Sequence, residues 1–113
     1  MGRRGVKTVE AQSVPESSEA EISLLAAEIN PDTETLDLHG MNQDEAEHAV
    51  ERFIDQAFMA NIYAVRIVHG VGSGTLRNLV YEVLDRSQLV QKWRPAPQPY
   101  SAGTVHVALV KRR

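Results

Sequence analysis

The sequence contains no cysteine. This absence excludes disulfide scaffolds, thiolate zinc sites and cysteine nucleophiles, so any metal site must use His, Asp or Glu side chains. The sequence also lacks an apolar run near the ~18 residues that span a bilayer, and residues 1–7 lack the apolar stretch of a signal peptide. We therefore expect a cytoplasmic protein without a membrane partner.

The chain has 113 residues, of which 42% are hydrophobic and 24% charged, which is typical of one compact domain with a modest core. Charge is unevenly distributed: the net charge is −3, with −4 in residues 1–35 and +1 in residues 36–113. A surface for nucleic acid in the second part therefore depends on local clustering of basic side chains.

Residues 1–32 have the composition of a flexible acidic tail, since the stretch 12–18 is polar and rich in turn-forming residues. Within this tail we predict a short helix over residues 18–29, which Pro31 ends. Its expected apolar face has helical spacing and could dock on the domain or on a partner; it consists of Ile22, Leu25, Ala26 and Ile29.

Residues 33–113 show the order β-α-β-α-β-β. Strands are predicted at residues 36–38, 63–68, 90–94 and 104–110. The first helix has a capping pair, Asn42 and Glu45, and the second begins near residue 73 or 74. Because a strand–helix–strand unit is right-handed with parallel strands, we predict an α/β fold with a mixed four-stranded sheet and its first two strands adjacent.

Polar side chains follow the first two strands at the sheet edge where ligands usually bind. Asp37 and His39 share a face of the first strand, and His69 ends the second strand. A glycine-rich loop then enters the second helix, an arrangement suited to phosphate. The candidate phosphate-binding residues, including two basic side chains of the third strand, are Gly70, Gly72, Ser73, Gly74, Thr75, Arg77, Lys92 and Arg94.

The loop matches neither a dinucleotide-binding fingerprint nor a P-loop, because its glycine spacing differs and no Gly-Lys-Ser/Thr follows. Two other residues have structural explanations that we favour. His106 alternates with valines on the last strand, so we expect its side chain to point outward. Trp93 is expected to pack partly buried, with stacking on a base as the alternative.

The segments Leu36-Asp37-Leu38-His39-Gly40 and His69-Gly70-Val71-Gly72-Ser73-Gly74 resemble the two signature motifs of the Smr (small MutS-related) domain. The resemblance covers roughly residues 35–111 and is strongest to the Smr domain that ends the second class of bacterial MutS homologues. It implies a two-layer sandwich similar to the C-terminal domain of translation initiation factor 3. It also implies an endonuclease that nicks DNA, or RNA in some members. Many MutS-linked relatives carry arginine where this chain has His39.

The resemblance assigns functional positions to Asp37, His39, His69 and the loop glycines. Our hypothesis is that the loop amides and Arg77 hold a phosphate while one of the two histidines acts as general base or acid. Asp37 then orients a histidine or binds a divalent cation, Mg²⁺ or Mn²⁺. The chain would form part of a larger MutS-like ATPase that acts in recombination control or DNA repair, with branched DNA as one candidate substrate.

Two alternatives remain open from the sequence. One is a non-catalytic module that binds structured nucleic acid or the ribosome through the same sheet edge. The other is an endonuclease that cleaves RNA. Loss of cleavage with retained binding, on removal of a histidine, separates catalysis from binding alone.

Overall fold

The structure is a computed structural model that describes residues 16–97 and 102–112. The expected tail up to residue 15 therefore lies outside the described residues, as does Arg113. The elements in chain order are α1 (Glu16–Ile29), β2 (Thr35–Asp37), α2 (Gln43–Met59), β3 (Ala64–Val68), α3 (Thr75–Arg86), β4 (Val90–Pro95) and β5 (Thr104–Leu109). In the described residues no helix is long and apolar enough to cross a membrane.

The four strands form one mixed sheet in the order β2-β3-β5-β4. Strands β2 and β3 are parallel and adjacent, with Leu36 opposite Ile67, as the strand–helix–strand pattern predicts. Strand β5 runs antiparallel to both β3 and β4, so it lies between them in the sheet. The expected β-α-β-α-β-β order is confirmed, and the carboxyl ends of β2 and β3 meet at one edge.

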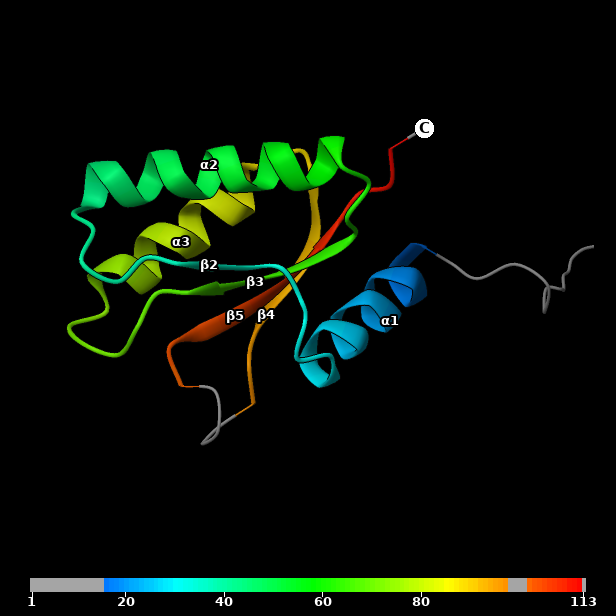
Figure 1. Cartoon of the computed structure of the whole chain (residues 1–113), viewed down its shortest axis with the longest axis horizontal. Coiled ribbons are helices and arrows are strands. Elements are labelled where there is room, and N and C mark those ends of the chain that lie inside the picture. Colours follow the sequence, from blue (N-terminus) through cyan, green and yellow to red (C-terminus); the bar gives the residue numbers. More distant parts are fainter. Residues whose placement is uncertain (1–15, 98–101, 113) are drawn as a thin grey trace, which may run out of the picture.

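Helices α2 and α3 cover one face of the sheet, and together with it they form the expected two-layer sandwich (Figure 1). The buried side chains follow helical spacing on the helices and alternate along the strands. Each fully buried valine or leucine contributes roughly 1.5–3 kcal/mol relative to an exposed one. The main residues of this core are Leu38, Ala46, Val50, Ile54, Val65, Ile67, Val80, Val83, Leu84, Val105, Val107 and Leu109.

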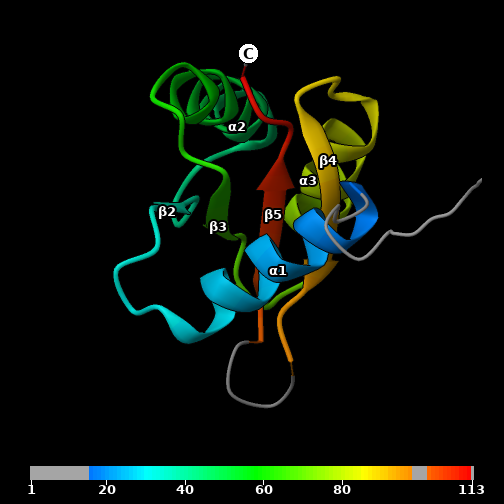
Figure 2. The same cartoon turned by 90° about the vertical axis from the view of Figure 1, so that its right-hand side faces the viewer.

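Helix α1 lies across the opposite face of the sheet, in front of β5 in Figure 2. The expected short helix begins at Glu16 rather than residue 18 and docks on its own domain. The predicted apolar face is wrong, because the helix buries Ala20, Leu24 and Ala27 instead. Small alanine side chains let the helix backbone approach Ala108 on β5. The predicted stripe, including Ile22 (59%), Leu25 (52%) and Ile29 (81%), is exposed.

The position of α1 also corrects the prediction for His106. The side chain points away from the valines on either side of it, as alternation requires, but that face is covered by α1. His106 is therefore 2% exposed rather than outward-facing in solvent.

Candidate active site

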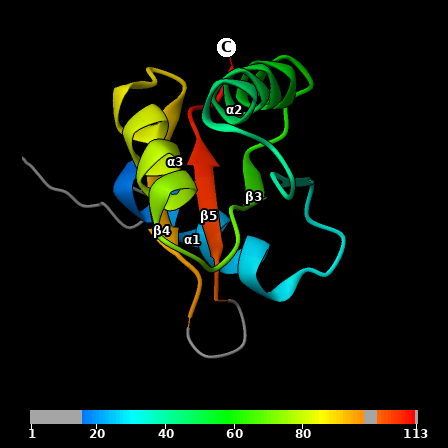
Figure 3. The same cartoon turned by 90° about the vertical axis from the view of Figure 1, so that its left-hand side faces the viewer.

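The ends of β2 and β3 are joined by a backbone hydrogen bond in which the Leu38 N–H donates to the Val68 carbonyl, at 2.9 Å. This bond places Asp37 and His39 one strand away from His69. The two histidines predicted from the sequence thus leave the sheet at the same edge, which faces the viewer in Figure 3.

The start of the glycine loop is held by the turn that precedes β5. The N–H groups of His69 and Gly70 both donate to the Gly103 carbonyl, at 2.8 Å and 3.1 Å. Gly103 has a φ of +80°, and a Cβ atom added there would lie 2.7 Å from the carbonyl carbon of Gly70. Only glycine allows this approach of two backbone segments. The reasoning from sequence missed Gly103, although a glycine just before a strand was a signal that could have found it.

His69 is held in one tautomer by the loop. Its Nδ1 lies 2.8 Å from the Gly70 carbonyl oxygen, which can only accept a hydrogen bond, so Nδ1 carries the proton. Nε2 therefore has a free lone pair. Burial lowers the pKa of His69, and the positive charge of Arg77 lowers it further, while the bond to Gly70 opposes both effects. The imidazole is thus neutral and basic near pH 7.

The ring of Tyr81 packs edge-on against His69, with centroids 6.1 Å apart and planes at 88°. Trp93 stacks on Tyr81 with ring centroids 4.4 Å apart, and its indole N–H donates to Asp85 at 2.8 Å. This confirms the packing role expected for Trp93. Tyr81 was missed from the sequence, because its distance from His69 depends on how α3 packs on the sheet.

Helix α3 begins in a way that leaves its N-terminus open to an anion. Helix α2 has a complete capping box between Asn42 and Glu45, as predicted, and acidic residues in its first turn. Helix α3 instead begins after Gly74, which makes no side-chain cap, and has no acidic residue in its first turn. The Thr75 N–H donates to Ser73 Oγ at a long 3.4 Å, and the helix N-terminus with its partial positive charge faces the loop without a resident carboxylate.

The guanidinium of Arg77 lies against the backbone of Gly74. A Cβ atom at Gly74, where φ is +92°, would lie 2.7 Å from Arg77 Nη2. The glycine thus makes room for the arginine to fold back over the loop. This adds a full positive charge beside the helix N-terminus.

A cleft of about 300 Å³ brings five of the eleven predicted site residues together. His69, Gly70, Gly72, Gly74 and Arg77 line it, and Tyr81 and Gly103 complete the lining. A smaller hollow of about 220 Å³ over the loop adds Ser73 and Thr75, whose hydroxyl oxygens lie 2.9 Å apart.

Asp37 and His39 lie beside this cleft rather than in its lining. The Asp37 carboxylate accepts the His39 backbone N–H at 2.9 Å, so it orders the turn after β2. His39 is exposed and lines a separate hollow with Glu45, His48 and Arg52 on α2.

Lys92 and Arg94 are not brought to the loop. Both side chains lie on the α1 face of the sheet, where they pair with Glu21 and, for Arg94, also with Glu28. Alternation along β4 explains this placement, because Trp93 between them points to α3. The sequence pattern showed the alternation but not which face held the loop.

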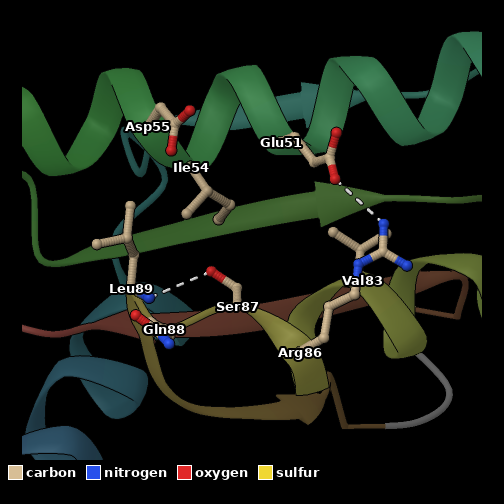
Figure 4. A pocket seen from close by; sticks show the side chains of 8 residues that line it. All are labelled: Glu51, Ile54, Asp55, Val83, Arg86, Ser87, Gln88 and Leu89. Atoms are coloured by element: carbon tan, nitrogen blue, oxygen red, sulfur yellow. Dashed lines mark hydrogen bonds and ion pairs between the residues drawn. The ribbon is translucent and has the colours of Figure 1, made fainter.

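A second large hollow, between α2 and α3, has a different character (Figure 4). Arg86, which lines it, pairs with Glu51 at 3.1 Å and also with Glu47. Its positive charge is thus neutralised within the protein, which makes this hollow a poor anion site. Among the described residues, no three His, Asp or Glu side chains are arranged to hold a metal ion.

The Smr domain family model matches residues 36–110, which run from the second residue of β2 to just past the end of β5. The chain belongs to the Smr family. In this Smr domain the family match begins after α1, so that helix lies outside it.

The Smr domain is 36% identical over 76 residues to the endonuclease MutS2 of Lactococcus lactis subsp. cremoris, covering 67% of this chain and 10% of that protein. It is 43% identical over 63 residues to the endonuclease MutS2 of Carboxydothermus hydrogenoformans, covering 56% of this chain and 8% of that protein. The chain thus spans about a tenth of the length of these relatives.

Two solved structures are similar. The Smr domain of Thermus thermophilus MutS2 superposes with a TM-score of 0.66 and 30% identity, over 69% of this chain and 99% of that one. YdaL, a stand-alone small MutS-related protein from Escherichia coli, superposes with a TM-score of 0.60 and 30% identity, over 72% of this chain and 67% of that one. These similarities agree with the family match and identify a domain of the MutS-related type.

Proposed function

We propose that this Smr domain is an endonuclease that hydrolyses one phosphodiester bond of DNA at a time. The observation that carries the proposal is the cleft in which a neutral His69, an uncapped helix N-terminus and the Arg77 guanidinium converge. Hydrolysis of a phosphodiester needs these three things: a base for water, donors for the phosphate oxygens and a positive charge.

In the first step the scissile phosphate sits over the glycine loop. The N–H groups at the start of α3 and the guanidinium of Arg77 donate to its non-bridging oxygens. These donors are fixed before substrate arrives, so they stabilise the charge that develops as phosphorus becomes five-coordinate.

His69 activates the attacking water. Its Nε2 lone pair accepts a proton from the water as the water oxygen bonds to phosphorus, while the Nδ1 proton stays directed at the Gly70 carbonyl. The lowered pKa keeps this nitrogen unprotonated at neutral pH.

We assign His39 as the general acid that protonates the leaving oxygen. When the P–O bond breaks, this oxygen takes a proton, and the exposed imidazole at the neighbouring end of β2 can supply it. Asp37 supports the step by holding the turn through the His39 N–H rather than by ligating a cation. A divalent cation, if required, would then depend on oxygens of the substrate for most of its ligands.

The cleft places one base, His69, beside one phosphate position, which favours nicking over double-strand cleavage. The similarity to MutS2 relatives supports a role within a MutS-like protein in DNA repair or recombination control. DNA is proposed over RNA because the two sequence motifs resemble those of Smr domains that nick DNA.

The test is conversion of supercoiled plasmid to the open-circular form. We expect nicking by the purified chain, loss of nicking in His69→Ala with retained DNA binding, and normal nicking in His48→Ala. His48, a histidine on α2, lies outside the cleft but in the same hollow as His39, so it controls for loss of a histidine there without loss of the assigned acid. Lanes with Mg²⁺, Mn²⁺ or EDTA decide the cation requirement.

Equal cleavage by wild type and His69→Ala would refute the assignment of the base. Binding without cleavage by every protein would favour a non-catalytic module. Cleavage of a matched RNA but not of the plasmid would move the substrate from DNA to RNA.

A further inference from the structure

Three positively charged side chains form a row across the α1 face of the sheet, with a histidine among them. The backbone register pairs Arg66 on β3 with His106 on β5, and His106 with Arg94 on β4. Lys92 lies two residues before Arg94 on the same face of β4. We call Arg66, Lys92 and Arg94 the basic row.

Helix α1 meets every member of the basic row with negative or acceptor oxygens. Arg94 Nη1 binds both carboxylate oxygens of Glu21, at 2.7 Å and 3.1 Å, and its Nε donates to Glu28 at 3.0 Å. Lys92 also pairs with Glu21, at 3.3 Å. Arg66 donates to the carbonyls of Ala27 and Asn30, at 2.8 Å and 3.3 Å, at the C-terminal end of the helix.

The apolar contact beneath α1 is small compared with the core on the other face of the sheet. It consists of Ala20 and Leu24 against Ala108, with Ala27 also buried, while the larger apolar side chains Ile22, Leu25 and Ile29 are exposed. The helix is therefore held by this small apolar contact together with charged hydrogen bonds to the basic row. Such contacts can be exchanged for those of another polyanion, because arginine binds carboxylate and phosphate with the same forked geometry.

A second, independent observation that the contact between α1 and this face is exchangeable comes from His106. It is 2% exposed, and its Nε2 accepts from Arg66 Nε at 3.2 Å, so the ring proton is on Nδ1. That Nδ1 has no hydrogen-bond partner among the described residues. A buried donor without a partner is unfavourable, and a phosphate oxygen on this face would satisfy it.

We propose that the basic row is a second nucleic-acid surface, whose phosphate positions are occupied by the carboxylates and C-terminal carbonyls of α1 in the structure described here. Arg94 directly precedes Pro95, which lines the candidate active-site cleft, and β4 is an edge strand. A strand of nucleic acid leaving the cleft can thus pass the edge of β4 and reach the basic row. The inference rests on the proposed function only in taking nucleic acid as the partner; it does not require that the domain cleaves nucleic acid.

The test compares DNA binding by two pairs of charge-neutralised variants in the full chain. Glu21→Gln/Glu28→Gln removes the ion pairs that α1 forms with Lys92 and Arg94 of the basic row. Glu47→Gln/Glu51→Gln is the matched control, because it also removes two carboxylates paired with an arginine but leaves the α1 face unchanged. All proteins carry His69→Ala, so that binding is measured without cleavage.

Binding of a fluorescent duplex is followed by anisotropy across a series of salt concentrations. We expect the Glu21/Glu28 variant to bind tighter than the Glu47/Glu51 control at low salt. We also expect its log–log salt slope to steepen by about 0.9 for each additional phosphate that the protein neutralises, or roughly 2 in all. Adding Arg94→Gln to the Glu21/Glu28 variant is expected to remove most of the increase in affinity.

The proposal is overturned if the two variant pairs bind DNA equally with the same salt slope, or if Arg94→Gln leaves the increase intact. Tighter binding of a poly-glutamate peptide, without an increase for DNA, would also overturn it, because the surface would then suit an acidic protein. Because no readout involves cleavage, failure of the proposed nuclease activity leaves these outcomes interpretable. Circular dichroism of each variant checks that the sheet remains folded.

Discussion

Replacing Gly103 with alanine is expected to destabilise the domain because the backbones of Gly103 and Gly70 lie close together. The N–H groups of His69 and Gly70 both donate to the Gly103 carbonyl, and a Cβ at residue 103 would lie 2.7 Å from the carbonyl carbon of Gly70. The contacted atoms are backbone, so they cannot turn aside as a flexible side chain would. The substitution must therefore displace the start of the glycine loop.

The magnitude has two parts. An alanine in the left-handed region, at a φ of +80°, costs about 1–2 kcal/mol. Forcing an extra carbon into a filled space costs a further ~1–3 kcal/mol. We therefore expect Gly103→Ala to lower the free energy of unfolding by about 2–5 kcal/mol, the sum of those two contributions.

Gly40→Ala is the matched control. Gly40 has nearly the same φ, +81°, but a Cβ there would meet nothing within 4 Å. Both substitutions restrict the unfolded chain equally, so that effect cancels when they are compared. The difference between them, about 1–3 kcal/mol, isolates the close approach.

Urea unfolding followed by circular dichroism measures both variants. With an m-value of about 1–3 kcal/mol/M, a difference of ~2 kcal/mol separates the two midpoints by roughly 1 M. If Gly103→Ala unfolds at the same urea concentration as Gly40→Ala, the tight contact between Gly103 and Gly70 does not constrain the residue at position 103, and the reasoning fails.

Three further predictions concern titration and charge. Burial lowers the pKa of His106 below its unfolded value of about 6.5. The unfolded state therefore binds more protons, and the free energy of unfolding falls as pH drops below that value. In urea titrations at about pH 5–8, His106→Gln should flatten this pH dependence. Tyr81→Leu should raise the pKa of His69 toward its ordinary value because it removes an aromatic ring that buries the imidazole. Tyr81→Phe keeps the ring and should leave the pKa of His69 unchanged. NMR titration of the imidazole measures the pKa in both variants. Arg77→Ala should weaken DNA binding and reduce the salt slope by about 1, and a slope unchanged in anisotropy titrations would exclude a phosphate contact by Arg77.

The parts of the fold that sequence predicted well depend on short-range patterns. The capping pair Asn42 and Glu45 is a local signal within one turn, and it forms as predicted. The parallel pairing of β2 with β3 follows from the handedness of strand–helix–strand units, so it too needs no knowledge of distant residues. The loop between His69 and Gly74 was found for the same reason, because its glycines sit where a strand meets a helix.

The parts that sequence missed depend on contacts between distant segments. Helix α1 carries apolar residues on more than one face, so its pattern cannot show whether Leu24 or Leu25 is buried. The choice is made by Ala108 and by the ion pairs of Glu21 with β4, which lie far along the chain from α1. Once α1 is docked, the burial of His106 and the pairing of Arg94 follow from strand alternation alone.

Strand β5 explains why one small sheet can carry two separate surfaces. Its valines at 105 and 107 point into the core beneath α2 and α3, while His106 and Ala108 point to α1. The turn before it supplies Gly103, which fixes the glycine loop at the end of the sheet. The loop therefore depends on the backbone at the start of β5, whereas the basic row depends on side chains along the α1 face. Loosening α1 should for that reason change the binding of phosphates without displacing His69.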